Sequence, residues 1–302
     1  MAEVISRFRE CLPHASIYAY DNDSEDSTYE IAAQSGAIVR REPRRGKGYV
    51  VRRMFADVSA DIYVLCDADL TYQIDAAPAL IGRLWDEGLD MLVGSRQPVV
   101  ENAYRAGHAF GNRMLTGLVR AIFGKGFNDM LSGYRVFSRR FVKSFPAMSQ
   151  GFELETELTI HALELEMPTA EVETRFNNRP VGSTSKLNTY RDGTRIMLTI
   201  LNLLKQERPL FSFGWTAVAL ALISLGLGYP LFVEFAETGL VPRFPTAILA
   251  SAMMLVACMF FFSGLILDTV SRGRREAKRL KYLEFNGIYE LKSEIERRAL
   301  HE

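Results

Sequence analysis

Two carboxylates separated by one small residue are the strongest chemical signal in this sequence. Asp67 and Asp69 flank Ala68 and follow Ile62–Cys66, an apolar run with the composition of a buried β-strand. A strand that ends in a loop would aim both carboxylates to one side, where they could hold Mg²⁺ or Mn²⁺ and leave sites for diphosphate oxygens. Alone, an Asp-x-Asp sequence more often marks a solvated loop, but the preceding strand favours a metal and nucleotide site.

A second polar cluster follows another short apolar run. Asp21 and Asn22 come directly after Ser16–Tyr20 and begin an acidic, amide-rich turn. Such side chains can bind the base and ribose of a nucleotide, but Asp, Asn and Ser are equally suited to an Asx-turn or a helix N-cap. Both readings can hold together, with Asp26 or Ser27 as the cap.

A basic segment with two glycines precedes a predicted helix. Lys47 lies between Gly46 and Gly48. Glycines beside a lysine at a helix start suit the close approach of a phosphate. A solvated basic turn explains these residues equally well.

Short apolar runs alternate with helical stretches between about residues 16 and 176. Continuous apolar strands separated by helices are typical of a mostly parallel sheet covered on both faces, so we predict an α/β fold. In such sheets ligands bind beyond the carboxyl ends of the strands, where both acidic clusters fall. The predicted strands are Ser16–Tyr20, Ala37–Val39, Ile62–Cys66 and Met91–Val93, and the predicted helices are Ser27–Gln34, Tyr49–Val58 and Ile74–Trp85.

Two apolar stretches, Phe213–Val233 and Phe244–Leu267, are each long enough to cross a bilayer. Neither contains a charged residue, and the short link between them predicts a hairpin whose outer ends face the same side. The dense positive charge that follows marks the cytosolic side. We therefore expect a multi-pass protein of the cytoplasmic membrane with its N-terminal domain and tail in the cytosol. The basic residues are Arg272, Arg274, Arg275, Lys278, Arg279 and Lys281.

Four segments follow from this pattern. Residues 1–188 form the predicted globular domain, 211–268 the two spans and 269–302 a basic cytosolic tail. Residues 189–210 contain an amphipathic helix, Tyr190–Glu207, which could lie on the bilayer or pack on the domain. Small residues in the first span would permit close helix packing in a homo-oligomer.

Bulk composition excludes little. Lys and Arg together number 36, as do Asp and Glu, so the net charge gives no indication of a nucleic-acid partner. The three cysteines are widely separated and suggest neither a disulfide framework nor a zinc site, which favours a reducing compartment. The first ten residues are charged and contain no apolar segment of the kind that opens a signal peptide.

Seven short motifs together resemble the family-2 glycosyltransferases, and most closely the dolichyl- or polyprenyl-phosphate sugar synthases. They cover roughly residues 15–205 and occur in the order seen in that family. The motifs are Asp-Asn-Asp-Ser-x-Asp-x-Thr (21–28), Gly-Lys-Gly (46–48), Asp-Ala-Asp (67–69), Gly-Ser-Arg (94–96), Asp-Met-Leu-Ser-Gly-Tyr-Arg (129–135), Gly-Phe-Glu-Leu-Glu-Thr-Glu-Leu (151–158) and Ser-Lys-Leu (185–187).

The resemblance implies a GT-A-like domain and a set of site residues. Asp21 would bind the base, Asp67 the nucleotide, and Asp69 the metal together with Asp67. Asp129 would orient or deprotonate an acceptor phosphate, and we favour orientation because such a phosphate needs little deprotonation at neutral pH. The remaining positions that it assigns are Asn22, Lys47, Ala68 and Arg96 on the donor side, and Arg135, Arg179, Ser185 and Lys186 on the phosphates of acceptor or donor. Glu155 or Glu157 would steady this basic cluster or touch the sugar, although exposed helix carboxylates are an equal reading.

The implied reaction is an inverting, metal-dependent transfer of a sugar from a UDP- or GDP-sugar to a polyprenyl phosphate. A bacterial-style architecture with two spans suggests undecaprenyl phosphate as that acceptor. Two alternatives are a different lipid or glycan acceptor and a truncated, non-catalytic membrane scaffold that binds nucleotide sugars. The second arises because family members begin with a strand ahead of the helix that starts here, so we expect the native product to begin roughly 15–20 residues earlier.

Overall fold

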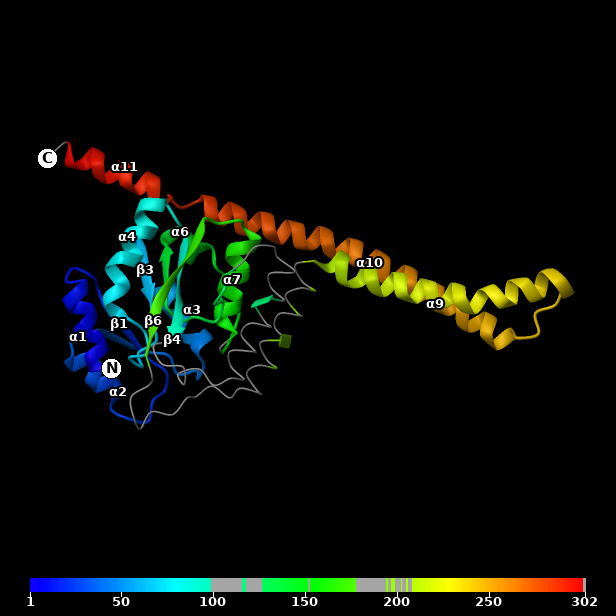
Figure 1. Ribbon diagram of the computed structural model, residues 1–302, viewed down its shortest axis with the longest axis horizontal. Helices are drawn as coiled ribbons and strands as arrows, with labels where there is room; N and C mark the ends of the chain where they lie inside the picture. The colour runs from blue at the N-terminus through cyan, green and yellow to red at the C-terminus, as the bar shows by residue number, and fades with distance from the viewer. Residues whose placement is uncertain are drawn as a thin grey trace. The chain divides into compact units, whose positions relative to one another are not determined.

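The computed structural model describes residues 1–98, 116–117, 127–151, 153–177, 194, 197–198, 202, 205 and 208–300. The chain divides into two compact units (Figure 1). One consists of Met1–Leu198 together with Lys278–Glu302, and the other of Thr199–Ala277. We describe each unit by itself.

The first unit is an α/β domain whose described strands form two sheets (Figure 1). Strands β1 (Tyr18–Asp21) and β2 (Ile38–Arg41) pair in parallel. The second sheet has the order β3-β5-β4-β6, in which β5 runs antiparallel to both neighbours and β4 and β6 are parallel. The α/β prediction is confirmed, but the sheet is mixed because β5 is inserted in the opposite direction. The bounds are β3 Ile62–Leu65, β4 Met91–Pro98, β5 Arg135–Ser138 and β6 Thr169–Phe176.

The predicted helices are present with bounds shifted by a few residues. The second predicted helix begins earlier, at Lys47, and the third ends at Gly88, whose φ of 64° is a left-handed C-cap that glycine adopts without strain. The helices of this domain are α1 Ala2–Cys11, α2 Thr28–Gln34, α3 Lys47–Asp57, η1 Ile74–Ala76, α4 Ala77–Glu87, α6 Arg139–Ser144 and α7 Leu154–Glu164.

Two apolar clusters lie on opposite faces of the four-stranded sheet. Successive residues of a strand point to opposite faces, and β5 shows this directly. Phe137 packs in the cluster with Phe141 and Leu158, from α6 and α7. Val136 packs in the cluster with Leu84 of α4. The sheet is therefore covered on both faces, as an α/β fold requires.

The C-terminal segment packs on this domain as well. The last residues of α10 (Phe244–Leu283), from Lys278 on, and α11 (Ile288–Ala299) belong to the first unit. The Tyr282 hydroxyl donates to Asp90 Oδ2 at 2.7 Å, and Asp90 is completely buried. Part of the predicted basic tail is thus ordered helix with its own place in the domain.

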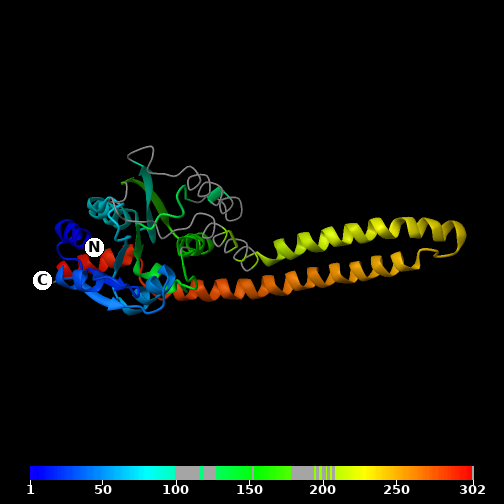
Figure 2. The same cartoon turned by 90° about the horizontal axis from the view of Figure 1, so that it is seen from below.

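The second unit is a helical hairpin made of α9 (Pro209–Thr238) and the part of α10 that ends at Ala277. The two helices run side by side in both ribbon views (Figure 2). Both are long and apolar enough to cross a membrane, and both predicted spans lie within them. Many of their large apolar side chains are exposed. Examples are Phe232, with an exposed fraction of 73%, and Ile266, with 64%. Such surfaces need lipid or another protein around them.

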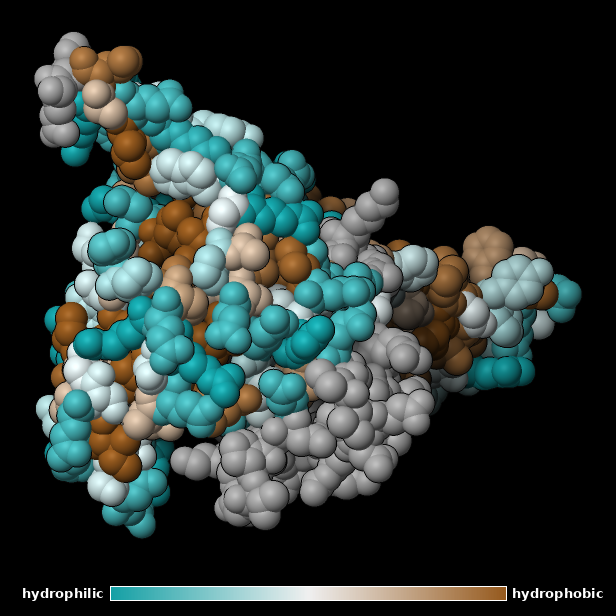
Figure 3. Space-filling model, turned by 60° about the vertical axis from the view of Figure 1, so that its left-hand side comes forward, coloured by the Kyte–Doolittle hydropathy of each residue, from teal (hydrophilic) through white to brown (hydrophobic). Residues whose placement is uncertain are grey.

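The surface of the first unit contrasts with these helices. Hydrophilic residues dominate the face shown in Figure 3, with apolar residues in scattered patches. This is the ordinary surface of a domain in water. The predicted amphipathic helix Tyr190–Glu207 lies almost wholly outside the described residues.

Candidate active site

The centre of the site is a lysine held between two carboxylates. Lys47 Nζ lies 2.6 Å from Asp67 Oδ1, at the end of β3, and 2.6 Å from Glu155 Oε1, on α7. Burial alone would lower the pKa of Lys47, but the charges of Asp67 and Glu155 outweigh it and raise that pKa. Lys47 is therefore a permanent cation beside the first carboxylate of the Asp-Ala-Asp sequence.

The glycines beside Lys47 allow close backbone packing. Gly46 has a φ of 141°, and a Cβ atom at Gly46 or Gly48 would overlap the carbonyl oxygen of Gln150 or Ser149. The Gly48 amide donates to the Gln150 carbonyl at 3.1 Å. These glycines thus seat the start of α3 on the loop that leads into α7, rather than leaving open space for a phosphate.

Two buried carboxylates of α7 hold that loop. Glu157 accepts from the amides of Met148 and Ser149 at 2.9 and 2.8 Å. Glu153 accepts from the amides of Gln150 and Gly151 at 3.2 and 3.1 Å. Neither Glu155 nor Glu157 is the exposed helix carboxylate that the sequence also allowed.

Asp69 lies in a strained turn. Its Oδ1 accepts from the Thr71 amide at 3.2 Å and from the Thr71 hydroxyl. Leu70, between them, has a φ of 61°, a left-handed conformation that costs a non-glycine residue about 1–2 kcal/mol. Strain of this kind is often retained where it aims functional groups. Ala68 is exposed at the tip of the same turn.

Arg96 and Asp129 form a second ion pair. The guanidinium Nε and Nη2 of Arg96, on β4, each lie 2.7 Å from an oxygen of Asp129. The Asp129 amide donates to Glu171 of β6 at 2.8 Å. The structure therefore joins two residues that the sequence analysis assigned to different substrates.

The position of Arg135 does not fit its predicted role of binding a phosphate. It is completely buried in β5, and its guanidinium donates to the carbonyls of Ser132, Met130 and Glu155 and to the Thr159 hydroxyl. Burial lowers its pKa to about 10, so it stays charged at neutral pH. In this arrangement Arg135 braces the 129–133 loop, and its donors face backbone rather than a ligand.

The first acidic cluster is also largely structural. Asp21 is 5% exposed and lies 3.8 Å from the Nε of Arg41. Asn22 donates to the carbonyls of Glu42 and Arg44, at 3.0 and 2.6 Å, and accepts from the Gly46 amide at 2.7 Å. Asn22 thus ties the turn after β1 to the segment that leads to Lys47.

Tyr72 and Gly133 were missed as site residues by the sequence analysis. The Gly133 amide donates to the Tyr72 hydroxyl at 2.8 Å. A Cβ atom at Gly133 would lie 2.6 Å from Asp67 Oδ2 and 2.9 Å from Lys47 Nζ. Gly133 therefore leaves the space that the Lys47–Asp67 pair occupies. The only sequence signal for it was its place in the Asp-Met-Leu-Ser-Gly-Tyr-Arg motif (129–135). The predicted phosphate-binding residues Arg179, Ser185 and Lys186 lie outside the described residues.

Comparison with known proteins decides the family. The model of the family described as "Glycosyl transferase family 2" matches residues 2–145. Glycosyltransferase AglJ of Haloferax volcanii is 32% identical over 288 residues, which cover 94% of this chain and 94% of that protein. The chain belongs to glycosyl transferase family 2.

Two further comparisons extend this result. The dolichol-phosphate mannosyltransferase of Pyrococcus furiosus is 28% identical over 172 residues, covering 53% of this chain and 48% of that protein. Glucosyl-3-phosphoglycerate synthase of Mycobacterium tuberculosis, solved with Mn²⁺, UDP and glucosyl-3-phosphoglycerate, matches with a TM-score of 0.53 and 25% identity, over 68% of this chain and 74% of that chain. The predicted GT-A-like fold is confirmed, and this structural neighbour binds Mn²⁺ together with UDP.

The residues of this family-2 chain fit a divalent cation. Asp67 and Asp69 supply two carboxylates at a strand end, and Mg²⁺ typically takes one or two carboxylates with substrate phosphates and water. Among the described residues there is no group of three or more His, Cys, Asp or Glu that could hold a metal alone. A cation at these two carboxylates would take its remaining ligands from water or from substrate phosphates.

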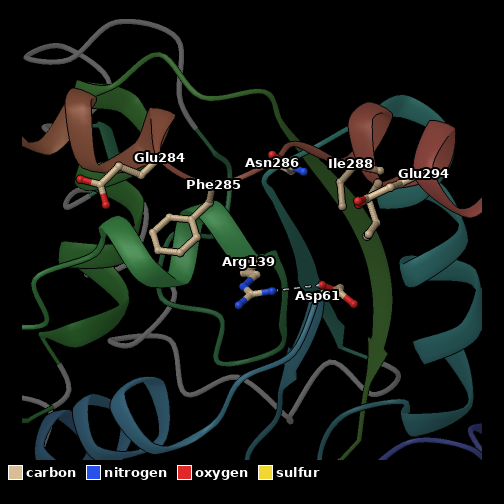
Figure 4. Close-up of a pocket in the computed structure, with 8 residues that line it drawn as sticks. Asp61, Arg139, Glu284, Phe285, Asn286, Ile288 and Glu294 are labelled. Atoms are coloured by element: carbon tan, nitrogen blue, oxygen red, sulfur yellow. Dashed lines mark ion pairs between the residues drawn. The ribbon is translucent and has the colours of Figure 1, made fainter.

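A cavity of about 280 Å³ lies at the other end of β3 (Figure 4). Asp61, before β3, and Arg139, after β5, line it together with Phe285 and Glu294 from the C-terminal segment. Because β3 and β5 are antiparallel, Asp61 and Arg139 lie at the same end of this strand pair, and Asp67 lies at the opposite end. The cavity is thus separate from the site described above.

Proposed function

We propose that this chain transfers a sugar, with inversion, from a nucleoside diphosphate sugar to a polyprenyl phosphate at the cytosolic face of a membrane. The observation that carries the proposal is the combination of a family-2 domain, with Asp67 and Asp69 at the end of β3, and two helices of membrane-spanning length. A water-soluble donor would reach the first, and an acceptor with a lipid tail would meet the second. The similarity to the dolichol-phosphate mannosyltransferase of Pyrococcus furiosus supports a lipid-phosphate acceptor.

On the donor side, Asp67 and Asp69 would hold Mg²⁺ or Mn²⁺. Asp21 would face the nucleotide, and Asn22 would contribute by holding the turn after β1 against the segment that leads to Lys47. The ion, when bound, would neutralise charge that develops on the departing diphosphate. Lys47 lies 2.6 Å from Asp67 and would add a second positive charge beside those phosphates. The proposed donor is a UDP- or GDP-sugar, and small differences in the loops determine which of the two nucleotides binds.

On the acceptor side, Asp129 and Arg96 would orient the incoming phosphate. Its oxygen would attack the anomeric carbon from the face opposite to the diphosphate, so one displacement inverts that carbon. Arg96 donates to Asp129 now and could share its planar fork with a phosphate. Arg179, Ser185 and Lys186 are proposed to complete the phosphate contacts.

The orientation of the hairpin follows from charge. Arg272, Arg274 and Arg275 follow the apolar part of α10, and such residues concentrate on the cytosolic side of a membrane. The chain ends that flank the hairpin would then both lie in the cytosol, where nucleotide sugars are made available to enzymes of this kind.

The test is transfer from radiolabelled UDP- and GDP-sugars to undecaprenyl phosphate, in detergent, with Mg²⁺, Mn²⁺ or EDTA. We expect label in the lipid phase from one donor, lost with EDTA and with Asp69→Asn. Asp75→Asn is a matched control, because Asp75 follows the same loop without belonging to the Asp-Ala-Asp sequence. If the label is transferred only to another lipid or to a glycan, the proposed acceptor is wrong. The absence of transfer from every donor tested would contradict the whole proposal.

A further inference from the structure

We propose that Glu155 is a positioning residue that divides the Lys47 ammonium between two carboxylates and so keeps Asp67 available to a divalent cation. This rests on the proposed function in one respect, namely that Asp67 and Asp69 hold that cation. Glu155 is not itself a ligand in this proposal. It acts through Lys47.

The geometry supports a shared lysine. Lys47 Nζ is 2.6 Å from an oxygen of Asp67 and 2.6 Å from an oxygen of Glu155. The exposed fractions of the side chains are 37% for Asp67, 17% for Lys47 and 6% for Glu155. The lysine therefore has one buried partner and one partner that faces the site, and a ligand can reach only the second.

Glu155 is costly to the fold without such a role. Its Oε2 atom is buried and has no hydrogen-bond partner among the described residues. A buried carboxylate needs compensation for its lost hydration, and apolar replacements of buried ion pairs are often neutral or stabilising. Packing alone would favour an apolar side chain at this point of α7.

The backbone around Lys47 keeps the ammonium in place. The Gly48 amide is bonded to the loop before α7, and Glu153 and Glu157 hold that loop from the same helix. The start of α3 is thus joined by a backbone hydrogen bond to the loop that leads into α7. The distance between the pair and Asp67 is set by this frame.

The charges of the side chains around Lys47 favour the binding of a divalent cation. Asp67, Asp69 and Glu155 contribute three negative charges and Lys47 one positive charge, so these four side chains together carry a charge of −2. Without the Glu155 carboxylate, Lys47 would neutralise Asp67 and leave only Asp69. Both the reduced charge and the undivided lysine would weaken binding of a divalent cation.

The experiment measures Mn²⁺ binding to the full chain in detergent by electron paramagnetic resonance of free Mn²⁺, without nucleotide. Glu155→Gln should weaken Mn²⁺ binding by about tenfold, the effect of one charge at this range in a partly buried site. Glu164→Gln is the matched control: Glu164 lies on α7, its side chain is 2% exposed, and it pairs with Lys278 at 2.7 Å. It should lose thermal stability without a change in Mn²⁺ affinity.

A double variant tests the mechanism. Lys47→Met with Glu155→Gln removes both buried charges and again leaves a net charge of −2, so Mn²⁺ affinity should return to within about twofold of the wild-type value. This variant also replaces the single one if Glu155→Gln alone does not fold. Unchanged or tighter binding in Glu155→Gln, or weak binding in the double variant, would overturn the inference.

Asp69→Asn separates this inference from the proposed function. If Asp69→Asn leaves Mn²⁺ binding intact, the proposed metal site is wrong. If Asp69→Asn abolishes binding and Glu155→Gln does not weaken it, the metal site stands and only the role of Glu155 fails.

Discussion

The guanidinium of Arg96 donates to both carboxylate oxygens of Asp129, from Nε to Oδ2 and from Nη2 to Oδ1, each at 2.7 Å. The backbone amide of Arg96 also donates to Asp129 Oδ2, at 3.1 Å. Three donors from one residue of β4 therefore fix the direction of this carboxylate. Glu171 of β6 holds the Asp129 amide from the other side. A carboxylate fixed in this way is suited to orient a substrate group, since its own freedom is already lost.

Replacement of Asp129 by Asn should separate binding from transfer. Asn keeps the shape but loses the charge that Arg96 requires, so we expect transfer to fall by roughly 10²–10⁴-fold. UDP or GDP affinity, measured by isothermal titration calorimetry with Mn²⁺, should stay within about threefold of wild type. A matching loss of nucleotide affinity would instead assign Asp129 to the donor side.

Gly133→Ala should disturb the metal and nucleotide site through a single methyl group. That Cβ would lie 2.6 Å from Asp67 Oδ2 and 2.9 Å from Lys47 Nζ, so one of the two groups must move. We expect transfer to fall at least tenfold, because displacements of about 1 Å have large effects on catalysis. Gly82→Ala, on α4, is the control because nothing lies within 4 Å of the added atom. Equal activity of the two variants would contradict this role of Gly133.

The parts of the site that depend on one segment could be predicted from the sequence. Asp67 and Asp69 were recognised because a β-branched apolar run directly precedes them, and the structure has β3 there. The pairing of Lys47 with Glu155 joins residues on α3 and α7, and no local pattern contains it. Partners so distant in sequence are determined by how the helices pack.

The burial of a side chain is a second property that could not be predicted from the sequence. Arg135 has the residue type that binds phosphate, and sequence alone does not distinguish an exposed arginine from one that is completely buried. The signal that was available is its neighbourhood, since Val136 and Phe137 continue the chain as an apolar strand. Strands β5 and β6 were not among the predicted strands. The antiparallel direction of β5 could not follow from the sequence either, because an apolar run has no direction until its pairing is known.

The docking of the C-terminal segment on the first unit should depend on Tyr282. Its hydroxyl donates to Asp90, which also binds Arg140 at 2.5 and 2.8 Å, so Tyr282→Phe removes one charge-assisted hydrogen bond and leaves the others. We expect local stability to fall by about 2 kcal/mol, measured as faster native-state proteolysis of the link at 284–287. Tyr289→Phe is the control, because Tyr289 is 63% exposed on α11. Equal cleavage rates for the two variants would refute the anchoring role.

His161 should make the first unit sensitive to acid. Burial, together with the charge of nearby Lys278, lowers the pKa of His161 to about 3, whereas an unfolded histidine titrates near 6.5. Above pH 6.5 both states hold a neutral imidazole, and below it only the unfolded state gains the proton, so stability is lost as pH falls toward 3. At pH 5 the loss should be about 2 kcal/mol relative to pH 7, measured by urea unfolding in detergent. His161→Phe, placed between Phe141 and Phe145, should remove this component of the pH dependence, and replacement of exposed His14 by Gln should retain it. An acid sensitivity that is the same in both variants would show that another group is responsible.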